Sequence, residues 1–309
     1  MGARKSGTVA LLGRPNVGKS TLVNALVGQK VAIVSPRPQT TRHRIVGVRT
    51  EPRGQIVLFD LPGVHRPLHR MNVQMMHLAR ETIKEVDVVL QLFAADEPPG
   101  QGEAFVVGLV SQLTTPVILV PNKVDLPAAR KHLRERVAFF TEKHNYAAVV
   151  PCSALTGEGV PLLLEELFAL LPEGEPLVPP DLTTTQSERF YLAELIREAL
   201  LERVEDELPF TTAVLVRHVE EQEREGRPPL LRLWADILVE NKSQKAIVVG
   251  KGGRMIKAIG TAARERIEKL LGVQLFLDLR VKARPGWREA QHVLSELAPV
   301  EVPWSGEER

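Results

Sequence analysis

A glycine-rich run near the N-terminus contains the residue types that bind a phosphate chain. Residues 13–20 read GRPNVGKS and fit the spacing G-x-x-x-x-G-K-[ST]. The glycines let successive backbone N–H groups curl around a β-phosphate, Lys19 reaches the β and γ oxygens, and Ser20 is suited to bind Mg²⁺. The run therefore predicts a nucleotide-binding loop formed by Gly13, Arg14, Pro15, Asn16, Val17, Gly18, Lys19, Ser20 and Thr21.

Three short motifs follow this loop along the chain, and one of them, NKVD, favours GTP over ATP. NKVD occupies residues 122–125, and the Asp125 carboxylate can accept hydrogen bonds from guanine N1–H and the 2-amino group. Adenine offers no matching donors, so ATP would leave a buried acceptor unpaired. The other two motifs are DLPG at residues 60–63 and SAL at residues 153–155.

These motifs predict a role for each part of the nucleotide site. Asp60 would hold Mg²⁺ through water, the Gly63 N–H would sense the γ-phosphate, and the Ala154 N–H would meet guanine O6. The predicted nucleotide contacts beyond the loop are Asp60, Leu61, Pro62, Gly63, Asn122, Lys123, Val124, Asp125, Ser153, Ala154 and Leu155.

The segment between the phosphate-binding loop and DLPG is expected to sense the γ-phosphate. Residues 37–44 read RPQTTRHR, and the hydroxyl of Thr40 or Thr41 can complete the Mg²⁺ shell in the GTP state. We favour Thr41. The alternative is a polar loop with two incidental threonines. The predicted metal site is therefore Ser20, Thr41 and Asp60.

The hydrolysis step has an unusual feature at Val64, which follows DLPG where many GTPases have a glutamine that orients the attacking water. A valine cannot do this, so intrinsic hydrolysis is expected to be slow or to use another device. Asn16 is a candidate ligand for K⁺, which would supply positive charge, or else it braces the loop. The predicted catalytic residues are Asn16, Lys19, Thr41 and Gly63. The nearby histidines are expected to be solvated loop residues: His43, His65 and His69.

The elements that position these motifs follow from an alternation of apolar runs and helical patterns, which is typical of βαβ units. Strands are expected at residues 8–12, 55–60, 86–93, 116–121 and 147–151. Helices are expected after Lys19, Met71, Glu103 and Arg130, and at residues 161–170. Residues 1–172 are therefore predicted to form an α/β G domain with a mixed, mainly parallel sheet. A proline-rich linker is predicted at residues 173–187.

The second half predicts a smaller α+β domain at residues 188–299, followed by a tail at residues 300–309. The expected elements are a helix at 188–204, a hairpin of strands at 211–219 and 230–240, a helix at 254–271, a strand at 273–283 and a final helix near Trp287. An apolar segment at 245–249 leads into GKGG at residues 250–253. This order is that of a type II KH domain, whose GxxG loop clamps single-stranded RNA. The predicted RNA-binding residues are Gly250, Lys251, Gly252, Gly253, Arg254 and Lys257.

Charge is divided unevenly along the chain, although the formal net charge is only +2. Residues 242–288 contain twelve basic and three acidic residues, which is locally +9, and residues 188–207 contain seven acidic and three basic residues. Concentrated positive charge is expected of a protein that binds a polyanion. A solvated, salt-bridged face is the alternative.

Composition and length favour a two-domain globular protein. The chain has 309 residues, of which 44% are hydrophobic and 25% charged. No apolar run approaches the ~18 residues of a membrane span, and the first residues lack the apolar core of a signal peptide, so a cytoplasmic location is expected. The single cysteine, Cys152, is expected to be a buried hydrophobe and not a nucleophile.

With both halves considered, the chain resembles the Era family of bacterial GTPases over nearly its full length. The resemblance rests on GRPNVGKS, QTTRHRIVG, DLPGVH, NKVD, CSALTG and IVVGKGGRMIKAIG, in that order. It implies a Ras-like G domain joined to a type II KH domain, with GTP or GDP and Mg²⁺ as ligands. It also implies binding to the 3′ end of small-subunit ribosomal RNA, a role in assembly of the 30S subunit, and peripheral association with the inner face of the cell membrane.

Two other classes of function compete with this reading. A P-loop kinase would need a lid and a site for an acceptor substrate, and the sequence shows neither pattern. A GTPase signalling or membrane adaptor would use the KH-like domain to bind protein instead of RNA.

Overall fold

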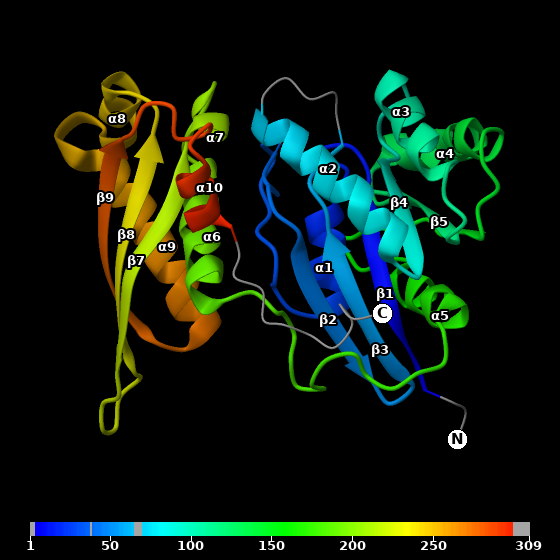
Figure 1. The fold of residues 1–309 in the computed structure, drawn as a ribbon, viewed down its shortest axis with the longest axis horizontal. Helices are drawn as coiled ribbons and strands as arrows, with labels where there is room; N and C mark the ends of the chain where they lie inside the picture. The colour runs from blue at the N-terminus through cyan, green and yellow to red at the C-terminus, as the bar shows by residue number, and fades with distance from the viewer. Residues whose placement is uncertain (1–3, 38, 65–69, 299–309) are drawn as a thin grey trace. The chain divides into compact units, whose positions relative to one another are not determined.

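A computed structural model of the protein describes residues 4–37, 39–64 and 70–298 (Figure 1). The chain divides into two compact units. Of the described residues, the first unit contains 4–32 and Thr41–Thr185, and the second contains Ile33–Thr40 and 186–298. The predicted tail at 300–309 lies outside the described residues.

The first unit is built on a six-stranded sheet in the order β2-β3-β1-β4-β5-β6 (Figure 1). Its strands are β1 (Lys5–Leu12), β2 (Ile45–Glu51), β3 (Gly54–Asp60), β4 (Val88–Ala94), β5 (Val117–Asn122) and β6 (Ala148–Val149). β2 runs antiparallel to β3, and the other neighbouring pairs are parallel. The predicted mixed, mainly parallel sheet is confirmed.

Helices cover both faces of this sheet, as its strands require because they are buried on both sides. They are α1 (Lys19–Val27), α2 (Arg70–Glu85), α3 (Gln101–Val110), α4 (Pro127–Thr141) and α5 (Val160–Leu170). Along β1, Val9 and Leu11 pack in the core beneath α1 and α5, whereas Ala10 and Leu12 pack in the core beneath α2 and α3. Because successive side chains of β1 point to opposite faces of the sheet, this strand contributes to two separate hydrophobic cores.

Residues 172–185, here called the strap, are the last part of the first unit and are hydrogen-bonded to its sheet. The fully buried Gln55 side chain on β3 donates to the Val178 carbonyl at 2.9 Å and accepts from the Val178 N–H at 3.0 Å. The Val48 N–H on β2 donates to the Thr183 carbonyl at 2.9 Å. The strap therefore lies against the outer side of β2.

The second unit contains a three-stranded sheet in the order β7-β8-β9, with strands β7 (Ala213–Gln222), β8 (Leu230–Val239) and β9 (Gln274–Ala283). β7 and β8 form the predicted antiparallel hairpin, and β9 is parallel to β8. Its helices are α6 (Glu188–Leu201), α7 (Leu208–Thr211), α8 (Lys242–Val249), α9 (Arg254–Leu271) and α10 (Gln291–Leu297). α6 and α9 pack on one face through residues such as Leu195 and Ile259. The order helix, two strands, two helices, strand is that of a type II KH domain.

Several elements differ from the sequence prediction, including the short helix α7, which was not expected. β2 was not expected, and it forms because Ile45–Glu51 pairs with β3 along its whole length. The apolar segment at 245–249 belongs to helix α8, whose start is capped by Asn241, which accepts a hydrogen bond from the Gln244 N–H at 2.9 Å. The last helix begins at Gln291 and not near Trp287, because Trp287 is buried and its indole N–H donates to the Thr211 carbonyl.

Candidate functional site

The predicted nucleotide motifs lie together because their strands are parallel. β1, β3 and β5 are paired in parallel through β1–β3, β1–β4 and β4–β5 contacts, so their carboxyl ends meet at one edge of the sheet. The phosphate-binding loop follows β1, DLPG begins at the end of β3, and NKVD begins at the end of β5. Ligands of open α/β sheets bind at this edge.

Lys19 lies in the phosphate-binding loop, at the first turn of α1. Its ammonium group is buried and donates to the carbonyls of Gly13 at 3.1 Å and Arg14 at 3.0 Å. Burial lowers the pKa of Lys19 to about 8, and the nearby Asp60 carboxylate opposes this shift. The lysine is therefore held inside the curl of the loop, where the phosphates are expected.

Three oxygen-bearing side chains from separate elements converge beside this lysine. The Ser20 hydroxyl donates to Asp60 at 2.5 Å and lies 2.9 Å from the Thr41 hydroxyl, which itself is 3.3 Å from Asp60. The other carboxylate oxygen of Asp60 is buried and has no hydrogen-bond partner within the described residues. Hard oxygen ligands with a spare buried carboxylate oxygen suit Mg²⁺.

The two adjacent threonines face different surroundings. The Thr40 hydroxyl donates to the Arg37 carbonyl at 2.6 Å, whereas the Thr41 hydroxyl is directed to Ser20 and Asp60. This geometry supports the preference for Thr41 as the metal ligand. Burial raises the pKa of Asp60, while Lys19 and the hydrogen bonds from Ser20 and Thr41 lower it.

Asn122 joins the phosphate-binding loop to the SAL motif. Its side-chain amide donates to the Val17 carbonyl at 2.8 Å, and its oxygen accepts from the Ala154 N–H at 2.9 Å. A Cβ at Gly18 would lie 2.2 Å from the same amide nitrogen, so this position needs glycine. Sequence reasoning missed this bracing role. The Ala154 N–H, expected at guanine O6, has a protein acceptor here, and its contact with the base stays a prediction.

Asp125 lies just beyond β5 and is half-buried. Within the described residues its carboxylate makes no hydrogen bond or ion pair, so its oxygens remain available to a base. Lys123, two residues before Asp125, has φ 68° and forms an ion pair with Asp96 at 3.4 Å. Asp96 was not predicted from the sequence, because its position in the loop after β4 carries no motif.

The end of the DLPG segment is packed tightly against the phosphate-binding loop. A Cβ at Gly63 would lie 2.7 Å from the Pro15 nitrogen, which explains the glycine. The Val64 N–H donates to the Gly13 carbonyl at 3.0 Å, and its side chain is 2% exposed. Val64 therefore offers no group that could orient water. His65 and His69 lie outside the described residues, and His43 is half-buried.

Asn16 and Cys152 complete the predicted features of this unit. Asn16 is exposed at the bend of the phosphate-binding loop with φ 64°, a left-handed conformation that asparagine tolerates well. Cys152 is fully buried, and burial with the nearby Glu158 raises the pKa of its thiol to about 12. The expected burial of this cysteine is confirmed.

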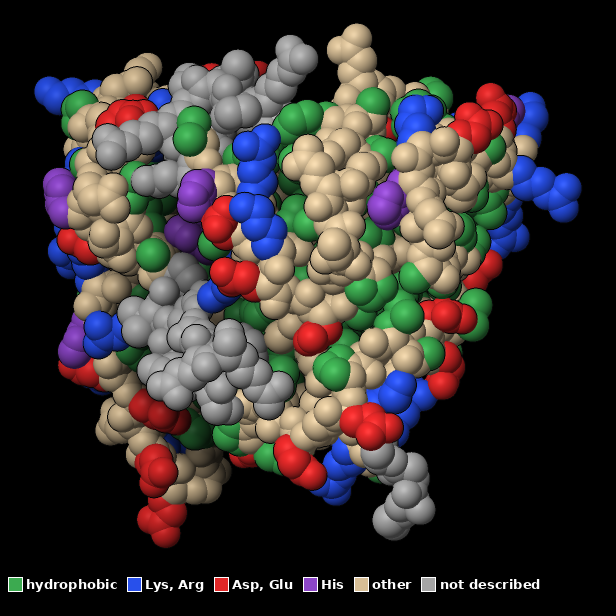
Figure 2. Space-filling model, turned by 45° about the vertical axis from the view of Figure 1, so that its right-hand side comes forward, with side chains coloured by type: hydrophobic (Ala, Val, Ile, Leu, Met, Phe, Trp, Pro, Cys, Tyr) green, Lys and Arg blue, Asp and Glu red, His purple; other side chains and the backbone are tan. Residues whose placement is uncertain are grey.

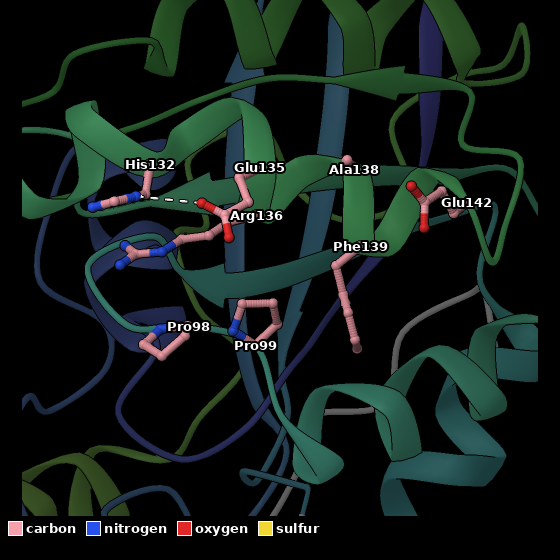
Figure 3. A pocket seen from close by; sticks show the side chains of 8 residues that line it. All are labelled: Pro98, Pro99, His132, Glu135, Arg136, Ala138, Phe139 and Glu142. Carbon is pink, nitrogen blue, oxygen red and sulfur yellow. Dashed lines mark hydrogen bonds and ion pairs between the residues drawn. The ribbon is translucent and has the colours of Figure 1, made fainter.

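A separate hollow of about 610 Å³ lies between the loop after β4 and helix α4 (Figure 3). It is lined by Pro98, Pro99, His132, Glu135, Arg136, Ala138, Phe139 and Glu142. The buried Arg136 guanidinium donates to the Ala95 carbonyl, next to the Asp96 that pairs with Lys123. The hollow contains none of the predicted site residues, and we interpret Arg136 as a support for the loop beside NKVD.

The GKGG loop connects α8 to α9 in the second unit, and its three glycines have left-handed backbones. Gly250, Gly252 and Gly253 have φ values of 74°, 62° and 76°. A Cβ at Gly250 would lie 2.7 Å from the Met255 Cβ, whereas a Cβ at Gly252 would meet no atom within 4 Å. Gly250 is thus required by packing, and Gly252 leaves open space above the loop.

Seven exposed basic side chains near this loop or on α8 and α9 have no carboxylate partner within the described residues. They are Lys242, Lys245, Lys251, Arg254, Lys257, Arg264 and Lys269. Arg266 instead pairs with Glu198 at 3.0 Å and Glu202 at 2.7 Å on α6. Part of the basic segment is therefore salt-bridged, and Lys251, Arg254 and Lys257, in and just after the GKGG loop, are available to a polyanion.

The face drawn in Figure 2 has a different character. Basic and acidic side chains are interspersed there, with hydrophobic side chains scattered among them. Mixed charge of this kind is typical of a solvated surface. The unpaired cations around GKGG are therefore a local feature and not a property of the whole surface.

A G domain with phosphate, metal and guanine-base motifs at one sheet edge, followed by a KH domain, defines this chain as a GTPase of the KH-containing class. Family profiles agree with both halves. A profile described as a 50S ribosome-binding GTPase matches residues 8–123, and a KH-domain profile matches residues 219–288.

The chain belongs to the Era family of GTPases. It is 44% identical to GTPase Era of Geobacter metallireducens, over 95% of this chain and 97% of the relative. Two solved structures are similar over 95% of this chain and 98% of theirs. An Era in complex with MgGDPNP and nucleotides 1506–1542 of 16S ribosomal RNA has a TM-score of 0.89 at 35% identity. A variant of Aquifex aeolicus Era bound to GDP and AlF₄⁻ has a TM-score of 0.88 at 34% identity.

Proposed function

We propose that this GTPase binds the 3′ region of small-subunit ribosomal RNA through its KH domain and assists assembly of the 30S subunit. The observation that supports this most is the similarity, over 95% of the chain, to an Era bound to a fragment of 16S ribosomal RNA. The unpaired cations around GKGG supply the charge that such a ligand requires. GTP binding and hydrolysis would switch the protein between two states.

The residues proposed for the nucleotide site act mainly by positioning. Ser20 and Thr41 would hold Mg²⁺ directly and Asp60 through water. Bound Mg²⁺ supplies charge neutralisation at the β- and γ-phosphates. Lys19 would add a second positive charge, and the N–H of Gly63 would report the presence of the γ-phosphate. Their convergence at one corner of the sheet edge supports these roles.

The ribosomal function is tested by measuring RNA affinity of the full-length protein at fixed salt. The 16S fragment of nucleotides 1506–1542 is expected to bind at least tenfold more tightly than a scrambled RNA of equal length, since sequence-specific RNA recognition uses base edges. Equal affinities would contradict the ribosomal assignment. No binding to either RNA would favour the adaptor, in which the KH domain contacts protein.

Asn16 gives a second prediction. Val64 provides no group to orient the attacking water, so hydrolysis is expected to use another device, and a K⁺ ion held by Asn16 would supply positive charge near the phosphates. If Asn16 is a K⁺ ligand, GTP hydrolysis is expected to be roughly tenfold faster in K⁺ than in Na⁺ at equal ionic strength. Single-turnover hydrolysis in the two salts measures this. Asn16→Ala and Asn16→Gly are both expected to abolish the difference.

The glycine variant serves as the matched control, since it accepts the backbone φ of 64° without strain. A wild-type rate that is the same in both salts would reject the ion. A salt difference that survives in both variants would reject Asn16 as its ligand.

The domain limits and the location complete the proposal. We propose a G domain at residues 1–172, a linker at 173–187 and a KH domain at 188–299. No helix in the described part of the chain is long and apolar enough to cross a membrane. A cytoplasmic location stays a prediction from the sequence, and peripheral association with the inner face of the cell membrane stays a prediction from the resemblance.

A further inference from the structure

Three aromatic rings form a row across the sheet of the second unit, one from each strand. His218 on β7 and Trp234 on β8 are direct cross-strand partners, with ring centroids 5.3 Å apart. Phe276 on β9 lies diagonally from Trp234, with centroids 6.3 Å apart and an interplanar angle of 62°. We call His218, Trp234 and Phe276 the aromatic row.

The aromatic row lies on the face of the sheet opposite to α6 and α9. Leu233 and Ala235, the neighbours of Trp234 along β8, belong to the core beneath those helices, so Trp234 points the other way. At one end of this outer face α10 packs over Leu238, with Trp287 buried beside it. Within the described residues, α10 is the helix that packs on the outer face, and it does not reach the aromatic row.

The side chains of the row are accessible and retain unused binding capacity. Phe276 is 52% exposed, which is unusual for a large ring in a strand. The Trp234 indole N–H has no hydrogen-bond partner among the residues that the structure describes, whereas the buried Trp287 donates its N–H to a carbonyl. An exposed ring and a free indole donor are typical of a surface that meets a ligand.

Around Asp236 and Asp278 on this face, the cations are more exposed than the carboxylates they pair with. Lys282 and Arg217 both bond to Asp236, and their side chains are 54% and 40% exposed while that carboxylate is 3% exposed. Arg280 is 66% exposed and covers Asp278, which is 28% exposed. Acidic side chains are also exposed at the β7 side of the face, where Glu296 (45% exposed) pairs with Arg217 and Glu220 (52% exposed) pairs with His218. Along β9 the cations are more exposed than the carboxylates they pair with, which favours an anionic partner on that side.

A fourth cation lies within the row itself. Arg232 is exposed, is the register partner of Phe276, and has no ion pair within the described part of the chain. A free guanidinium beside an exposed ring can bind a phosphate while the ring stacks on the adjacent base. Phe276 and Arg232 thus supply both halves of a nucleotide contact.

We propose that this outer face is a second binding surface for single-stranded RNA, on which bases stack on the aromatic row and phosphates contact the outer cations. After Phe276, the outward residues of β9 include Arg280 and Lys282. These two residues are nearer to the end of the sheet at which β8 is followed by α8. A strand held at the GKGG loop can be continued along this line. This inference rests on the proposed RNA-binding function and extends it to a longer RNA.

Two other roles for the row are less well supported. Cross-strand aromatic pairs stabilise a sheet, but that role does not require Phe276 to be half in solvent or Arg232 to be unpaired. A protein partner would favour burial of aliphatic side chains at the centre of the face, and the face has cations there instead. RNA accounts for the rings and the charge together.

The test uses full-length protein and fluorescently labelled oligouridine of two lengths. An RNA of about four nucleotides fills a GxxG site alone, and one of about sixteen can extend further. Phe276→Ala is expected to weaken binding of the longer RNA roughly tenfold, because one stacked base is lost, and to leave the short RNA unchanged. Phe276→Tyr keeps a ring and is expected to bind as wild type does.

Phe276→Leu separates stacking from apolar contact, since it keeps apolar area without a ring. It is expected to lose long-RNA affinity as the alanine variant does. Leu270→Ala, on an exposed apolar residue of α9, is the matched control and is expected to have no effect. RNA should also quench the fluorescence of Trp234, and Trp234→Phe should remove that quenching. Unchanged binding of the four-nucleotide RNA verifies that the second unit of each variant is folded.

The outcomes separate the two proposals. If Phe276→Leu binds the longer RNA as wild type does, stacking is excluded and the outer face is not an RNA surface. If wild type binds both RNAs but no row variant changes the ratio of the two affinities, the second surface fails while the KH function stands. If wild type binds neither oligouridine, the second surface fails, and the KH function is decided by binding of the 16S fragment.

Discussion

Replacing Asp125 by asparagine is expected to turn the guanine-specific site toward xanthine nucleotides. The carboxylate is half-buried at the end of β5 and free of protein partners in the described structure, so it can accept two hydrogen bonds from guanine. An asparagine offers one acceptor and one donor, and the donor suits the 2-oxygen of xanthine. GTP affinity should fall by roughly a hundredfold or more, while XTP affinity rises.

Titration calorimetry with GTP and XTP measures this exchange. Asp181→Asn makes the same chemical change at an exposed position of the first unit and is expected to leave both affinities unaltered. An Asp125→Asn protein that still binds GTP as tightly as wild type would rule out the base-reading role. Loss of both nucleotides would instead indicate that Asp125 supports the loop.

Changing Lys251 and Gly252 together to aspartate should abolish RNA binding and spare GTP hydrolysis. The double change alters the local charge by about −3, in a loop where phosphates must approach the backbone closely. Gly252 has φ 62° and open space above it, and aspartate is one of the residues that tolerate a left-handed backbone, so the fold should persist. A loss of at least about a hundredfold in RNA affinity is expected.

Lys269→Asp with Gly272→Asp is a closely matched control at the other end of the same helix. Gly272 also has a left-handed backbone, with φ 68°, and a Cβ there would meet no atom within 4 Å. The control carries the same charge change and is expected to retain most RNA affinity, as measured by fluorescence anisotropy at fixed salt. If the GKGG variant also retains affinity, the KH domain does not bind RNA through this loop.

Most of the fold could be predicted from the sequence because its signals are local. Helix α9 was expected at residues 254–271 and is found there, since a glycine cap precedes it and Gly272 ends it. β2 was missed because its residues, read as part of the switch, become a strand through pairing with β3. The position of α10 depends on the burial of Trp287 against Thr211, which lies far away in the chain.

The nucleotide site was predictable to the level of motifs but not of contacts. GRPNVGKS, DLPG and NKVD are short, ordered and placed after strands, so a parallel sheet is enough to bring them together. The bracing by Asn122 and the ion pair from Asp96 to Lys123 depend on tertiary geometry. The aromatic row had a weaker local signal, namely the alternation that places Phe276 on the outward side of β9.

The strap has a consequence for the solubility of the first unit. An uncovered edge strand exposes N–H and C=O groups that can pair with another chain and start aggregation. β2 is the edge of the sheet, and the Thr183 carbonyl and the Thr184 hydroxyl occupy its outward groups at Val48 and Val46. The prolines of the strap have no backbone N–H to donate, so at those positions the strap itself cannot pair with another chain as an edge strand would. The segment that leads out of the G domain thus also protects it from self-association.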